Sequence, residues 1–115
     1  MTPSRCLFAE KRTLKAKAGG TLVIAMDLYD ISPSPVDGLF LERFRLSWIA
    51  FDFENPEKKV LVDSHPPVGL HYHFDDGDQI KLELTTLDEA LMFFETKVIE
   101  HFGEIEGRIY ADFYI

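Results

Sequence analysis

The chain of 115 residues contains a single cysteine, Cys6, so an intrachain disulfide is excluded. It also lacks any run of about 18 apolar residues, which a membrane-spanning helix would need. Its first residues include no apolar stretch of the kind that a secretory signal carries. We therefore expect a cytoplasmic protein without a membrane anchor, held together by a hydrophobic core rather than by cross-links.

Positive charge is also scarce. Twelve Lys and Arg oppose twenty Asp and Glu, which gives a formal net charge of −8. Proteins that coat nucleic acid or bind anionic membranes carry the opposite sign, so the composition disfavours RNA as a partner and excludes membrane binding. The charge is uneven, with +4 on the first twenty residues and −12 on the remainder. The basic strip is either a site for a phosphate or an acidic partner, or the lysine-protected edge of a sheet, and the second interpretation is favoured.

Apolar and polar residues alternate over most of the chain, as is typical of strands. Two such runs flank Gly19-Gly20 and predict a hairpin. In the longest run the period of two places Trp48 on one face and Arg43 and Arg45 on the other. The predicted strands span residues 7–17, 21–29, 39–53, 59–62, 70–74, 79–84 and 108–115.

One helix is predicted in the C-terminal half of the chain. Thr86 and Glu89 fit a capping box at its start, and Gly103 is a natural stop. Between them the apolar residues recur at helical spacing, at Leu87, Ala90, Leu91, Phe94, Val98, Ile99 and Phe102. The sequence therefore predicts a single α+β domain over residues 1–115, with an antiparallel β-sheet packed on one long helix.

Titratable side chains are densest around three of the four histidines, His65, His71 and His73. His71 and His73 lie two residues apart on an extended segment, so we expect their imidazoles to point the same way. Asp63 precedes the cluster and Asp75 follows it. The fourth histidine, His101, lies near the end of the predicted helix, where a cation suits the helix dipole, and is interpreted as structural.

Three interpretations of the cluster remain open from the residues alone. His-x-His with a carboxylate suits zinc or a non-haem metal, although the cupin motif fails because no glycine lies at the expected distance before His71 and no glutamate at the expected place after His73. Paired imidazoles with Arg43 or Arg45 on a phosphate would make a metal-independent ribonuclease. The commonest fate of such clusters is structural, with the imidazoles hydrogen-bonded to the loop and to the turn at Asp75.

The order of these features resembles the TumE family, whose members are taken to be toxins of bacterial toxin–antitoxin pairs. The resemblance covers about residues 7–102, and Asp63, His71 and His73 fall where the family has an aspartate and a histidine pair. It rests on the opening hairpin and on residues 43–48, 60–63, 65–73 and 86–102. The chain departs from the family at Ser64, where members often have asparagine, and after Gly103, where the tail has no counterpart.

The resemblance implies a cytoplasmic bacterial or archaeal toxin, whose partner is an antitoxin that often carries a helix-turn-helix. No cofactor is expected. A second copy of the chain is a further partner considered. The alternatives are a non-enzymatic interaction module, acting through the basic hairpin or the aromatic C-terminal strand, and a His-x-His metal-binding protein. We hypothesise that the active or binding site comprises His65, His71 and His73, oriented by Asp63, with Arg43 and Arg45 nearby.

Overall fold

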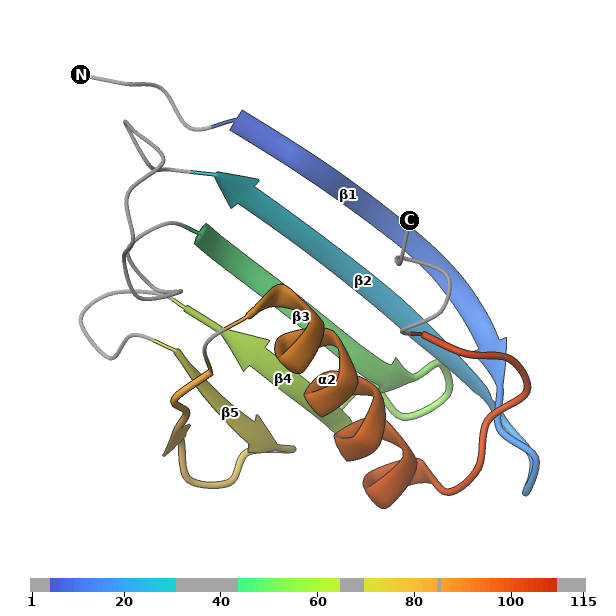
Figure 1. Ribbon diagram of the computed structural model, residues 1–115. Helices are drawn as coiled ribbons and strands as arrows, with labels where there is room; N and C mark the ends of the chain where they lie inside the picture. The colour runs from blue at the N-terminus through green and yellow to red at the C-terminus, as the bar shows by residue number, and fades with distance from the viewer. Residues whose placement is uncertain (1–4, 31–43, 65–69, 85, 110–115) are drawn as a thin grey trace.

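The computed structural model describes residues 5–30, 44–64, 70–84 and 86–109. Among these residues, six strands form one antiparallel sheet in sequence order and one helix packs against it (Figure 1), so the predicted α+β class is confirmed. The strands are β1 Arg5–Lys15, β2 Thr21–Asp30, β3 Phe44–Asp52, β4 Lys59–Asp63, β5 His71–Phe74 and β6 Ile80–Lys81, and the helix is α2 Leu87–Phe102. Arg43, His65 and residues 110–115 of the predicted last strand lie outside the described residues.

The predicted hairpin is formed by β1 and β2. Gly19 and Gly20 turn the chain with φ angles of 115° and 93°, a region that residues with side chains rarely adopt. β1 is an edge strand over most of its length, as the favoured interpretation of the basic strip requires. At its end, Ala16 forms an isolated bridge with Ile105, so the chain after the helix returns to the first strand.

The core lies between the sheet and α2. Trp48 in β3 is fully buried, and its ring centroid lies 5.9 Å from that of Phe94 in the helix. Tyr72 in β5 meets the helix in the same way, with 5.0 Å between its ring centroid and that of Phe93. The cross-strand register of the sheet aligns Trp48 with Met26 on β2 and Val62 on β4, so one continuous row of apolar side chains supports the helix.

The ends of α2 agree with the prediction. The hydroxyl oxygen of Thr86 accepts a hydrogen bond from the Glu89 amide at 3.1 Å, and Gly103 follows with a φ of 81°. The predicted apolar face needs correction at Ile99, which is 36% exposed. Its place in the buried set is taken by Glu95, a carboxylate that the apolar pattern missed.

The burial of Glu95 depends on the segment that follows the helix. The Arg108 guanidinium lies 2.7 Å from the Glu95 carboxylate, and this ion pair raises the pKa of Arg108. The same segment is joined to the edge strand by two backbone hydrogen bonds. The Lys17 amide donates to the Glu104 carbonyl at 2.8 Å, and the Glu106 amide donates to the Lys15 carbonyl at 2.7 Å. Arg108 and Ile109, which were predicted to begin a strand, therefore lie outside any strand of the described chain.

The predicted strand 79–84 is shorter than expected, because only Ile80 and Lys81 pair with β5. Beyond them Leu82 donates to the Leu70 carbonyl at 3.0 Å, and the chain leaves the sheet for the helix. β2 lies between β1 and β3 and is therefore not an edge strand. None of the described helices is both long and apolar enough to cross a membrane.

Candidate functional site

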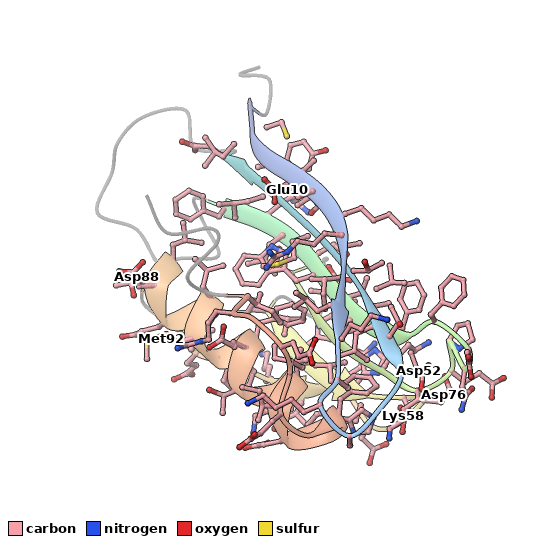
Figure 2. The ribbon with its side chains drawn as sticks, turned by 90° about the vertical axis from the view of Figure 1, so that its right-hand side faces the viewer. Glu10, Asp52, Lys58, Asp76, Asp88 and Met92 are labelled. Carbon is pink, nitrogen blue, oxygen red and sulfur yellow. The ribbon has the colours of Figure 1, made fainter. Side chains whose placement is uncertain are left out.

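One face of the sheet lies away from α2, and no described helix covers it. Figure 1 shows α2 and the segment after it on the same side of the sheet, and Figure 2 shows Asp88 and Met92 on the outer side of that helix. Because side chains alternate along each strand, the register identifies the residues of the opposite face, which we call the open face. The open face comprises Cys6, Ala9, Lys11, Thr13, Lys15, Thr21, Val23, Ala25, Asp27, Tyr29, Arg45, Ser47, Ile49, Phe51, Lys59, Leu61, Asp63, His71, His73 and Lys81.

The four described residues of the hypothesised site all lie on the open face. Asp63 on β4 is the direct cross-strand partner of His71 on β5, and Arg45 is on β3. Facing residues of this kind have Cβ atoms about 5 Å apart, so the Asp63 carboxylate lies within reach of the imidazole. The rings of His71 and His73 are 6.4 Å apart at their centroids and nearly parallel, which confirms that the two imidazoles point the same way.

The two imidazoles differ in exposure and in hydrogen bonding. His71 is 4% exposed, whereas His73 is half-buried. Nδ1 of His73 lies 2.9 Å from the carbonyl oxygen of Asp75, which can only accept, so this nitrogen carries the hydrogen. In its neutral form His73 therefore has its lone pair on Nε2, as a general base requires. The same contact with the Asp75 turn is the kind that the structural interpretation predicts.

His101 belongs to a separate cluster at the end of the helix. Asp75 has a φ of 52°, and its carboxylate accepts from the Lys59 amide at 2.8 Å and lies 2.9 Å from His101 Nε2. The ring of His101 also stacks on Phe74, with 4.8 Å between centroids. These contacts join the C-terminal end of α2 to β4 and to the β5–β6 turn, so His101 is structural, as its position in the sequence predicts.

From the contact between Asp75 and His101 we predict how the stability of the protein depends on pH. The hydrogen bond from His101, followed by that from the Lys59 amide, holds the pKa of Asp75 below its ordinary value of 3.8. A carboxylate with a lowered pKa stabilises the folded state above the unfolded pKa, and the benefit is lost as pH falls through the folded value. We expect Asp75→Asn to lose stability relative to wild type at pH 6, and the difference to shrink below about pH 4.

Urea unfolding between pH 3 and 6 measures this difference. Asparagine tolerates the left-handed backbone at position 75, so the substitution tests the carboxylate rather than the turn. Asp76→Asn is the matched control, because the Asp76 carboxylate is 87% exposed and lies 3.8 Å from the Lys59 ammonium. A difference between wild type and Asp75→Asn that stays constant over the whole pH range would contradict the assignment.

Arg45 lies beside a hollow that the sequence did not reveal. The hollow has a volume of about 200 Å³ and is lined by Asp27, Tyr29, Arg45, Leu46, Ser47 and Ser64. Ser64 is held beside Leu46, because its hydroxyl oxygen accepts from the Leu46 amide at 2.9 Å and its own amide donates to the Leu46 carbonyl. A second, more open hollow of about 350 Å³ extends towards Lys11 and shares Asp27 and Ser47 with the first.

Asp27 links these hollows to the core. Its carboxylate accepts from the Ser47 amide at 2.9 Å, and its carbonyl accepts from the indole of Trp48 at 2.6 Å. The carboxylate and the carbonyl of Asp27 are thus both held in place by β3. The one signal in the sequence is that Asp27 interrupts the apolar run of β2, which carries buried residues before and after it.

Arg45 and His73 are not close enough to hold the same phosphate. His73 on β5 lies two strands from β3, in the cross-strand row of Ile49. Arg45 precedes Ile49 by four residues, so the Cα atoms of Arg45 and His73 are roughly 16 Å apart. His71 is nearer, at roughly 12 Å by the same reasoning. A ligand that contacts both ends of the site must therefore be extended, with anionic groups at more than one point.

The open face has a charge opposite to that of the whole chain. It carries five basic side chains, Lys11, Lys15, Arg45, Lys59 and Lys81, against the two carboxylates Asp27 and Asp63, which gives +3. The complete chain carries −8, so the remainder carries −11. The acidic composition that disfavours nucleic acid is thus concentrated elsewhere, on the turns, the helix and the tail.

The described residues bring no three His, Cys, Asp or Glu side chains close enough together to hold a metal ion. The metal interpretation depended on His71, His73 and a carboxylate, and His65, a further ligand candidate, lies outside the described residues. No family model, curated protein or solved structure matches the chain. The described part of the chain therefore defines the class as a six-stranded antiparallel meander with one helix on one face and a basic, histidine-bearing open face.

Proposed function

We propose that this protein is the toxin of a toxin–antitoxin pair similar to the TumE family, and that it acts as a metal-independent ribonuclease through the open face. One observation supports this most: Arg45, Asp63 and the histidine pair come from three strands and project from the same face. That face carries +3 in a chain of −8, which suits a polyanionic substrate.

The arrangement supports acid–base cleavage of RNA. Nε2 of His73 takes the proton of a ribose 2′-hydroxyl, and the 2′-oxygen forms a bond to the adjacent phosphorus. The bond from phosphorus to the 5′-oxygen breaks, leaving a 2′,3′-cyclic phosphate, and the 5′-oxygen takes a proton from His71. The Asp63 carboxylate orients the His71 ring, and Arg45 binds another phosphate of the same RNA strand.

The surface outside the open face suits binding of an antitoxin. Outside the open face the chain carries −11, which favours a partner with a basic surface, such as a DNA-binding antitoxin. An antitoxin of this kind is expected in the neighbouring open reading frame. Its co-expression should restore growth to cells that the protein arrests.

Induced expression in a bacterial host tests the proposal. We expect growth arrest by the wild type and growth within about a factor of two of the empty vector for the His71→Ala plus His73→Ala variant, because proton transfer contributes 10²- to 10⁴-fold to such reactions. Circular dichroism and a thermal melt of the purified variant establish that it folds. A folded double variant that arrests growth as strongly as the parent would show that the site is wrong.

A non-enzymatic interaction module is the second candidate. The observation in its favour is that the outer edge of β1 accepts a strand-like segment at Ala16, where Ile105 pairs with it. Under this function the double histidine variant keeps its effect on growth. Lys11→Pro, which removes an amide from the edge strand, abolishes it.

A further inference from the structure

The open face combines a half-buried apolar centre with a basic rim. Ile49, Leu61 and Phe51 occupy the middle of the sheet and are each partly accessible. The exposed amines of Lys11 on β1 and Lys81 on β6 lie at opposite sides of that centre. A face of this kind offers two different contacts to one ligand, apolar in the middle and cationic around it.

An aromatic side chain extends this centre at one end. Phe53 follows Phe51 at the end of β3 and is 66% exposed, the most exposed large apolar side chain of the described residues. Its amide donates to the Thr21 carbonyl at 2.9 Å, which continues the pairing of β3 with β2. Phe53 is absent from the buried core, so packing does not explain a phenylalanine there.

These contacts match the two sides of a single-stranded nucleic acid. Unpaired bases stack on aromatic and apolar side chains, while phosphates pair with lysine and arginine. A duplex buries its base faces and presents a regular rod of phosphates, which a flat apolar centre cannot use. An acidic protein segment would satisfy the rim and leave the centre without a matching group.

We infer that the open face binds single-stranded RNA, laid across the strands from β1 towards the histidines on β5. The inference rests on the proposed function, which it deepens by naming the form of the substrate. Lys11 and His73 lie in the same cross-strand row, joined through Ala25, Ile49 and Leu61, and are roughly 19 Å apart at Cα. A short run of nucleotides spans this distance and presents several phosphates to the rim.

Fluorescence anisotropy of the full chain with a labelled oligonucleotide tests the inference. The probe is a mixed-sequence strand of about 12 nucleotides with 2′-O-methyl groups, which the proposed chemistry cannot cleave. We expect the single strand to bind at least about tenfold more tightly than the duplex of the same sequence. With three phosphate contacts, the logarithm of the affinity should fall with the logarithm of salt concentration with a slope of about −2.

Three variants divide the surface into its parts. Lys11→Glu plus Lys81→Glu changes the face from +3 to −1, and we expect it to weaken binding by about tenfold or more and to flatten the salt dependence. Phe53→Ala should weaken binding by about fivefold with an unchanged slope, because it removes stacking alone. Lys58→Glu is the matched control: its ammonium lies over Phe102 of the helix, and binding should stay within about twofold.

Each other outcome overturns the inference. Equal affinity for the duplex, or a Lys58→Glu variant as weak as the open-face pair, means that only diffuse charge attracts the probe. Displacement of the probe by poly-glutamate at equal charge concentration means that the face recognises acidic protein. The proposed function fails separately: tight binding of the modified strand without cleavage of the unmodified one would remove the ribonuclease and keep the binding face.

Discussion

Replacing His73 with alanine is expected to lower the rate of RNA cleavage by a factor of about 10² to 10⁴, the usual contribution of a general base. His73 is the more accessible imidazole of the pair, and its Nδ1 contact with the Asp75 carbonyl at 2.9 Å leaves Nε2 as the proton acceptor. Cleavage of a labelled single strand under single-turnover conditions measures the chemical step. The affinity for the 2′-O-methyl strand should change by less than about threefold, because His73 is only one contact of the face.

A second substitution separates the role of His73 as a base from a role in holding the turn. Glutamine can still donate an N–H group towards the Asp75 carbonyl, but it cannot take up a proton. We expect His73→Gln to retain the stability of the wild type and to lose cleavage as fully as His73→Ala. The limb of the pH–rate profile that reports the base should disappear with it. If His73→Gln cleaved RNA as fast as the wild type, His73 would act only by holding the turn at Asp75 and not as a base.

Replacing Trp48 with alanine is expected to lower the free energy of unfolding by about 3–5 kcal/mol, a large share of the total for a domain of this size. Trp48 is fully buried, contacts Phe94 of the helix and donates its indole N–H to the Asp27 carbonyl. The substitution therefore leaves a cavity beneath the helix and an acceptor without its donor. Chemical denaturation in urea measures the loss.

Trp48→Phe is the matched control for this prediction. It keeps most of the ring contact with Phe94 and removes the hydrogen bond to Asp27, so we expect a loss of about 1–2 kcal/mol. Because Asp27 lines both hollows of the open face, oligonucleotide binding should weaken in Trp48→Phe although the residue lies on the opposite face. A loss below about 1 kcal/mol in Trp48→Ala would contradict the central place given to this residue.

Local signals account for what the sequence predicted well. Thr86 and Gly103 bracket the helix because a hydroxyl and a left-handed glycine satisfy its ends without help from the rest of the fold. Gly19 and Gly20 specify the hairpin turn in the same way. The faces of β3 followed from alternation alone, since Leu46, Trp48 and Ala50 are all buried.

Long-range pairing accounts for what the sequence did not predict. The burial of Glu95 requires Arg108, thirteen residues away on a segment whose course the pattern did not reveal. The hollow beside Arg45 depends on Ser64, which reaches it only because β4 pairs with β3. The charge of the open face likewise emerges from the register of six strands, whereas the net charge of −8 sums over both faces and conceals it.

The bridge between Ala16 and Ile105 has a consequence for the order of folding. Each strand of the sheet pairs with its neighbour in the sequence, so the meander can assemble progressively as the chain leaves the ribosome. The hydrogen bonds on the outer side of β1 near Lys15 form later, because their partners Glu104 and Glu106 are synthesised almost ninety residues after this strand. A nascent chain therefore carries an incomplete sheet edge until residues 104–106 have been synthesised, and a ribosome stalled before Glu104 holds a protein that still lacks this closure.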